Sequence, residues 1–133
     1  MSDPAITLSD ATIHNPAEPR HFMSLKPVTG RVRILMGNLV LADSTDALRV
    51  LEVGEGVYDP VVYMPKTDVR TELHRNARQT HCPLKGDAVY FDLDSEESIA
   101  WSYPDPHGFA SGLAGRVAFY TDRVTIEESP TSS

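Results

Sequence analysis

Short runs of β-branched and aromatic residues make up most of this chain, and turn residues separate them about every eight to twelve positions. One such run, Ala47–Val53, alternates with a period of two and ends at Gly54 and Gly56. No stretch keeps the helical period, although Phe109–Gly115 could form one short helical turn. The pattern therefore predicts an all-β, mostly antiparallel fold with at most one short helix.

Two segments carry the signature of a hairpin turn. Arg31–Met36 and Leu39–Ala42 flank Gly37-Asn38, a two-residue turn whose glycine supplies a positive φ. In Cys82–Gly86, proline and glycine stand where a type I turn and the following left-handed residue need them. Further strands are predicted at Ala47–Val53, Pro60–Pro65, Val69–His74, Ala88–Leu93, Ile99–Tyr103, Val117–Tyr120 and Val124–Ile126.

The domain boundaries follow from proline content and polarity. The length of 133 residues fits one domain. Residues 1–29 carry four prolines and little periodic hydrophobicity, which predicts an extended arm outside the sheet. Residues 30–126 form the predicted β domain, and the polar residues 127–133 are expected to be a disordered tail.

Composition excludes several classes of function. Nineteen acidic and twelve basic residues give a net charge of −7 without a gathered basic patch, so no nucleic-acid partner is expected. No segment approaches the roughly 20 apolar residues of a membrane span, so no membrane partner is expected. The single cysteine, Cys82, excludes an internal disulfide and favours a reducing, cytoplasmic location.

Three stretches together carry a family resemblance: Val62–Pro65 with Asp68-Val69, Thr80–Asp87 with Tyr90, and Ala100–Pro104 followed by Val117–Tyr120. In this order and spacing, residues 30–126 resemble the bacterial and fungal domain of unknown function 427 family, which is also labelled nucleotidyltransferase-like. The resemblance implies a compact, tent-like domain of two sheets, as in Mss4-type proteins. Related tent-like domains often hold zinc through four cysteines, which this chain lacks.

Aromatic and basic residues in these stretches are candidates for a binding pocket. The rings would normally fill a small β core, but around an open pocket they would form stacking walls for a flat or anionic small molecule. Trp101 is the strongest candidate for exposure, because Pro104 and Pro106 stop its strand. The predicted ligand-binding residues are Arg33, Tyr63, His81, Lys85, Tyr90, Trp101 and Tyr103.

Catalytic candidates lie in the same turn. Cys82 is the only thiol, and a nucleophilic role would need a base or a cation beside it. In an extended segment His81 points to the opposite face, whereas the turn folds Lys85 back toward Cys82. Lys85 and Asp87 are two residues apart, so they could pair or flank a ligand, although a surface ion pair and a packed cysteine are the simpler interpretations.

No metal or cofactor is predicted. The histidines never stand at ligand spacing, and Gly54-Glu55-Gly56 lacks the rest of a phosphate-binding loop. Nucleotidyl transfer usually needs paired carboxylates, and the alternating Asp92 and Asp94 run into what resembles a solvated turn. Three hypotheses remain: a small-molecule-binding domain, an enzyme that uses Cys82 or Lys85 with Asp87, and a homodimer whose arm packs on a neighbour.

Overall fold

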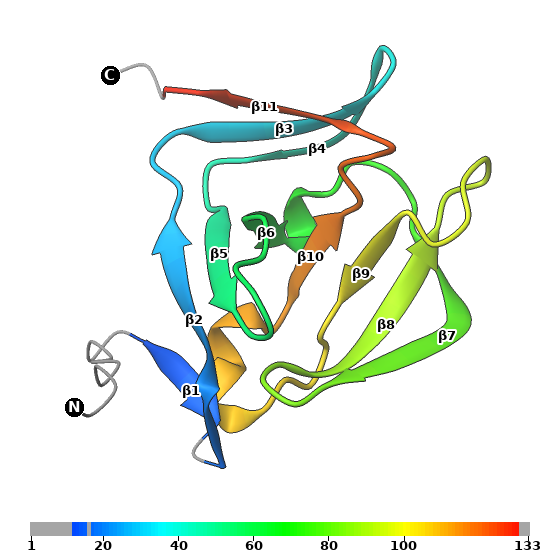
Figure 1. Cartoon of the computed structure of the whole chain (residues 1–133). Coiled ribbons are helices and arrows are strands. Elements are labelled where there is room, and N and C mark those ends of the chain that lie inside the picture. The colour runs from blue at the N-terminus through cyan, green and yellow to red at the C-terminus, as the bar shows by residue number, and fades with distance from the viewer. Residues whose placement is uncertain (1–11, 16, 131–133) are drawn as a thin grey trace.

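The structure, a computed structural model, describes residues 12–15 and 17–130 (Figure 1). Its helical elements are two short 3₁₀ turns, η1 (Lys66–Asp68) and η2 (Gly108–Leu113). The strands are β1 (Ile13–Asn15), β2 (Glu18–Pro27), β3 (Arg31–Met36), β4 (Leu39–Ser44), β5 (Leu48–Val53), β6 (Val61–Pro65), β7 (His74–Cys82), β8 (Gly86–Asp92), β9 (Ala100–Ser102), β10 (Arg116–Phe119) and β11 (Thr125–Ser129). The predicted all-β class is confirmed.

The strands form two antiparallel sheets. The larger has eight strands in the order β1-β2-β5-β6-β10-β9-β8-β7, and the smaller has three in the order β11-β3-β4. The smaller sheet lies across one end of the larger one (Figure 1). The two edge strands of the larger sheet are β1 and β7. Nδ2 of Asn15, in β1, donates a hydrogen bond of 3.2 Å to the carbonyl oxygen of Pro83, which directly follows β7. The larger sheet therefore curves until its two edges approach each other.

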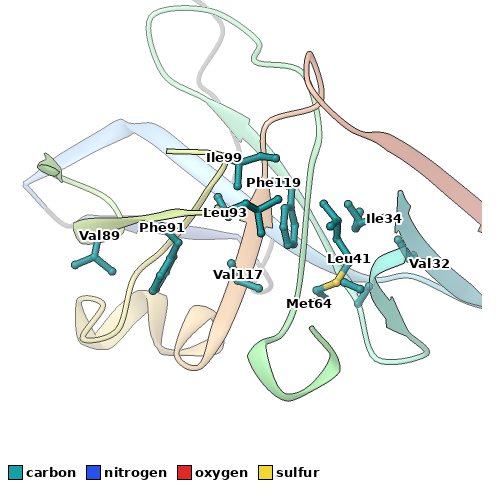
Figure 2. Close-up of a cluster of buried hydrophobic side chains, with 13 residues drawn as sticks. Val32, Ile34, Leu41, Met64, Val89, Phe91, Leu93, Ile99, Val117 and Phe119 are labelled. Atoms are coloured by element: carbon teal, nitrogen blue, oxygen red, sulfur yellow. The ribbon is translucent and has the colours of Figure 1, made fainter. Parts of the chain in front are cut away.

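Two hydrophobic clusters lie on opposite faces of the larger sheet. Successive residues of one strand enter different clusters: Val89 and Phe91 enter the first, and Ala88 and Tyr90 the second. The first cluster joins the two sheets and is drawn in Figure 2. The second lies inside the curve of the larger sheet, where Leu113 of η2 contributes to it. The period-two alternation of β-strands thus produces two cores in one small domain.

The N-terminal segment differs from the predicted arm. β1 and β2 are strands of the larger sheet, and β2 pairs with β5 from Phe22 opposite Val53 to Pro27 opposite Leu48. The prolines misled the prediction because the Pro27 nitrogen faces away from β5 and lies beyond the residues of β2 that pair with β1, so its missing N–H removes no ladder bond. Met23, in the part of β2 that pairs with β5, is fully buried. Pro4 and Pro16 lie outside the described residues, as do the rest of 1–11 and residues 131–133 of the expected tail, whereas 127–129 belong to β11.

The two predicted hairpins are present, but one predicted strand is displaced. Gly37 has a φ of +61° between β3 and β4, and Gly86 has a φ of +119° where β8 begins. The strand predicted at 69–74 is instead β7, which begins at His74. Val69 makes only an isolated bridge to Ala42, because η1 turns the chain immediately before it.

A hydrogen-bonded carboxylate holds the loop between β8 and β9. Oδ1 of Asp92 accepts hydrogen bonds from the Ser98 amide at 2.8 Å and from Nδ2 of Asn76 at 2.7 Å. Ser98 has a φ of +51°, an uncommon conformation for a residue with a side chain. The bonds from Ser98 and Asn76 lower the pKa of Asp92 below its ordinary value. Asp92 thus orders the loop that the sequence predicted as a solvated turn.

Replacing Asp92 with asparagine should reduce the acid sensitivity of the fold. A carboxyl whose pKa is lowered by folding stabilises the protein above its unfolded pKa of about 4, and this stabilisation is lost as pH falls through the folded pKa. The free energy of unfolding, measured by urea denaturation from about pH 5 to pH 3, should therefore fall less steeply in Asp92→Asn. Asp94→Asn is the control, because that side chain is 99% exposed. Equal slopes for Asp92→Asn and the wild type would contradict this role of Asp92.

Candidate functional site

Four polar side chains from distant parts of the chain meet inside the curve of the larger sheet. His21 comes from β2, Glu52 from β5, Cys82 from the end of β7, and Lys85 from the turn before β8. We call these four residues the polar cluster. Met23 pairs directly with Glu52 across the two strands, and Met23 and Val50 both enter the inner core. Strand alternation therefore turns His21 and Glu52 toward the same interior.

Glu52 is the centre of the cluster. Its Oε1 accepts from Nζ of Lys85, and its Oε2 lies 2.7 Å from Nε2 of His21. The Lys85 side chain is only 9% exposed and that of Glu52 only 13%. Because β5 and β8 are not neighbours in the sheet, Lys85 reaches Glu52 across its concave side. One ring nitrogen of His21, one carboxylate oxygen of Glu52 and Sγ of Cys82 all lie within 4.8 Å of one another.

The charges of the cluster stabilise one another. Burial alone would raise the pKa of Glu52, but the hydrogen bonds and charges of His21 and Lys85 outweigh burial and lower it. Glu52 is therefore a carboxylate at neutral pH. A buried carboxylate and ammonium cost desolvation energy that an apolar pair would not, so the cluster is not what packing alone would select.

Three aromatic rings pack behind Lys85. Nζ of Lys85 lies 5.9 Å from the ring centroid of Tyr103, and the rings of Tyr103 and Tyr63 are 6.5 Å apart. Nε1 of Trp101 donates to the Tyr63 hydroxyl at 3.1 Å, with the two rings edge to face. Burial raises the pKa of both Tyr63 and Tyr103. The three predicted stretches thus do converge, but Tyr63 and Tyr103 are buried at 2% and 8% exposure and form the wall behind the cluster.

Asp87, His81, Tyr90 and Arg33 each have a polar partner other than Lys85. Asp87 pairs with His81, with 2.8 Å between Oδ1 and Nδ1, and both side chains are exposed. Asp87 does not share a face with Lys85, because Lys85 belongs to the turn and Asp87 to β8. Tyr90 is buried in the inner core and its hydroxyl bonds Oγ1 of Thr80 at 2.7 Å. Arg33 lies in β3 of the smaller sheet, 3.4 Å from Glu127.

His21 and Glu52 are not among the site residues predicted from the sequence. His21 lies in the segment predicted as an arm, and Glu52 lies in a run that alternates with a period of two. Glu52, however, is in phase with the buried Val50, while Leu51 on the opposite face is 41% exposed. A carboxylate in phase with a buried position was the signal available in the sequence.

Removing the Tyr63 hydroxyl should destabilise the aromatic wall. Tyr63→Phe leaves the Trp101 indole N–H without its acceptor, so the free energy of unfolding should fall by about 1 kcal/mol. The emission of Trp101, the only tryptophan, should shift as well. Tyr58→Phe is the control, because Tyr58 is 45% exposed. If both variants match the wild type in stability and emission, the hydrogen bond contributes nothing.

A surface cavity reaches the cluster at His21. Its volume is about 380 Å³. It is lined by Glu18, Arg20, His21, Gly54, Glu55 and Tyr58. The lining comes from the start of β2 and the loop after β5, and the Tyr58 hydroxyl accepts from the Glu55 amide at 3.3 Å. His21 therefore connects the buried carboxylate to a space open to small molecules.

These features define a small all-β domain whose curved sheet encloses a buried polar cluster beneath a surface cavity. The family model described as Domain of unknown function (DUF427), with the label NTP_transf_9, matches residues 24–129. The chain belongs to this family, as its motifs predicted. Glu52, Cys82 and Lys85 lie within the matched range, and His21 lies just before it. A comparison with curated proteins gave no match.

No helix among the described residues is long and apolar enough to cross a membrane.

Proposed function

We propose that the chain is a small-molecule-binding β domain whose ligand enters the cavity beside His21 and contacts the polar cluster through that ring. The observation that carries the proposal is the continuous polar connection from the cavity through His21 and Glu52 to Lys85. Burying a charged pair costs desolvation energy, and perturbed titratable groups cluster at functional sites, which supports a role of the polar cluster in binding. The cavity volume of about 380 Å³ lies within the usual range for small-molecule sites.

The lining indicates the class of ligand. Arg20 supplies a guanidinium, Glu18 and Glu55 supply carboxylates, and Tyr58 supplies a partly exposed ring. These groups suit a flat small molecule that carries both an anionic group and hydrogen-bond donors. A flat or anionic small molecule is also the class predicted from the sequence. The proposed contact surface differs, because the ligand would contact the cavity lining and not the predicted rings. In the proposed arrangement Lys85 and the Tyr63, Trp101 and Tyr103 rings hold the cluster from behind, and the ligand lies against Tyr58.

A thermal-shift screen tests the proposal. Nucleotides, cyclic imides and common metabolites are each added to the full chain, and a ligand present at about 100 times its dissociation constant should stabilise the fold by about 2.7 kcal/mol. The stabilisation should disappear in Arg20→Ala. Arg33→Ala is the matched control, because Arg33 lies in the other sheet. A broad screen without a stabiliser, or a stabiliser equally effective on both variants, would count against the cavity.

A second candidate function is an enzyme with Cys82 as nucleophile. The specific observation is that a ring nitrogen of His21 lies within 4.8 Å of the thiol while Glu52 bonds the same ring. A thiol, an imidazole and a carboxylate activate a nucleophile when the carboxylate bonds one ring nitrogen and the other ring nitrogen takes the thiol proton. Because Glu52 bonds Nε2, Nδ1 of His21 would be the base in this candidate. The alternative pair of Lys85 and Asp87 receives no such support, since each has a different partner.

Alkylation kinetics test the nucleophile. Loss of the base in His21→Ala should slow iodoacetamide labelling of Cys82 by about tenfold or more in the presence of a chelator. His81→Ala, next to Cys82 in the sequence but bonded to Asp87, should label at the wild-type rate. Unchanged labelling in His21→Ala would remove Cys82 as an activated nucleophile.

Self-association is the third possibility. Leu51, Val57 and Tyr58 are exposed apolar side chains of β5 and the loop after it, with Val57 84% exposed. Because residues 18–27 form a strand of the sheet, a test of the arm must remove only residues 1–11. If residues 1–11 hold a dimer, their deletion should give a monomer in sedimentation measurements. If the exposed apolar loop holds it, Val57→Asp should give the monomer.

A further inference from the structure

The donor atoms of His21, Glu52 and Cys82 match those of a transition-metal site. An imidazole nitrogen, a carboxylate oxygen and a thiol sulfur lie within 4.8 Å of one another. All three residues are partly buried, which distinguishes them from surface carboxylates that meet by chance. Thiolate and imidazole ligands select zinc-like ions over magnesium or calcium, which prefer oxygen ligands alone.

We infer that His21, Glu52 and Cys82 bind one Zn²⁺ ion, with a fourth coordination position open toward the cavity. Three protein ligands with one open position is the pattern of zinc sites that contact a substrate or a water molecule. The inference rests on the same cluster as the proposed function, but it requires no organic ligand. Its test therefore uses the metal alone, and the two can fail separately.

The geometry permits closure around an ion with small movements. Ligand atoms around tetrahedral zinc lie about 3.3 to 3.6 Å apart, as follows from its bond lengths of about 2.0 to 2.3 Å. Atoms now within 4.8 Å of one another must approach by about 1.5 Å at most. Nε2 of His21 and Oε2 of Glu52, now 2.7 Å apart, would instead separate slightly if the ion took the place of their shared hydrogen.

Lys85 would be a positioning residue. Its ammonium holds Oε1 of Glu52 and leaves Oε2 for the ion. Zinc binding converts the Cys82 thiol to a thiolate and releases its proton to the buffer, so the ion meets two anionic ligands and one nearby cation. The net charge of −7 also favours cation binding over the whole molecule.

The three ligands are far apart in the sequence, so no sequence motif predicts the site. Residues 21, 52 and 82 fit no short motif, since each comes from a different part of the sheet. No metal was predicted from the sequence, because no histidines stand at ligand spacing along the chain. A pair of histidines lies outside the proposed site, where the rings of His81 and His107 are 5.9 Å apart. His81 therefore supplies the control.

Titration of the metal-free full chain with Co²⁺ and Zn²⁺ tests the inference. We expect one equivalent of Co²⁺ to bind with a thiolate-to-metal charge-transfer band, Zn²⁺ to displace it with proton release, and bound Zn²⁺ to protect Cys82 from iodoacetamide. Loss of a ligand in Cys82→Ser or His21→Ala should weaken Zn²⁺ binding about 100-fold or more, and Lys85→Met about tenfold. His81→Ala should bind as the wild type does, and circular dichroism checks that each variant is folded.

Binding of Co²⁺ without the charge-transfer band would overturn the inference, because the thiol would then not be a ligand. No stoichiometric binding, or affinity that depends on His81 but not on Cys82, would overturn it as well. The wild-type spectrum and the protection of Cys82 need no variant, so an unfolded variant does not leave the question open. If the chain binds no Zn²⁺ but the thermal-shift screen finds a ligand, the metal site is rejected and the proposed small-molecule site in the cavity is retained.

Discussion

Replacing Lys85 with alanine should lower the free energy of unfolding by about 3 kcal/mol, as measured by urea denaturation near neutral pH. Lys85 neutralises Glu52 in a place where both side chains are largely shielded from water. Its loss leaves a buried carboxylate with only His21 as a partner. Lys26→Ala, in the exposed part of β2, is the control and should change stability by less than about 0.5 kcal/mol.

Glu52→Gln and Lys85→Met complete a double-mutant cycle that separates the ion pair from other effects of each substitution. Each single change leaves one partner of the pair uncompensated, whereas the double variant removes both charges. The double variant should therefore be more stable than the sum of the single losses predicts, with a coupling of about 1 to 3 kcal/mol. Strictly additive losses would show that the two side chains do not interact.

Gly30→Ala should destabilise the domain by about 3 kcal/mol or more. Gly30 has a φ of +124°, and a Cβ built there would lie 2.4 Å from the Ser129 carbonyl oxygen. The atoms nearest this Cβ belong to the backbone of Ser129 and Pro130, so the clash cannot be relieved by a side-chain movement. The substitution should push β11 away from β3, since Ser129 pairs with Arg31 there.

Gly56→Ala is the matched control for Gly30. A Cβ at Gly56 meets nothing within 4 Å, and its backbone is outside the left-handed region. Alanine there should leave stability unchanged or raise it by up to about 1 kcal/mol, because it restricts the unfolded chain. Equal effects of the two substitutions in thermal unfolding would contradict the close approach of Gly30 to β11.

Local features of the fold could be predicted because local residues determine them. The β3–β4 hairpin follows from Gly37-Asn38, and the turn that carries Lys85 follows from Pro83 and Gly86. The convergence of Lys85 with Tyr63 and Trp101 could also be anticipated, because the family-like stretches fall in short strands with turns between them. These predictions required only alternation and turn chemistry.

The composition of the site could not be predicted from such local features. Whether β2 joins the sheet depends on its pairing with β5, a long-range contact that local proline content obscures. The burial of Glu52 depends on Lys85, whose ammonium arrives from across the curved sheet. In the same way, Asp87 lies two residues from Lys85 but bonds His81, because the two belong to different elements. Long-range partners, rather than neighbours in the chain, determine which polar residues face inward.

The ring signals of His21 in two-dimensional ¹H–¹⁵N spectra test the polar cluster most directly. If His21 lies against Glu52 and Cys82, then Glu52→Gln and Cys82→Ser should each displace its signals. Those of the exposed His74, at the far end of β7, should stay in place. His21 signals that remain unmoved in both variants would show that these three residues do not meet.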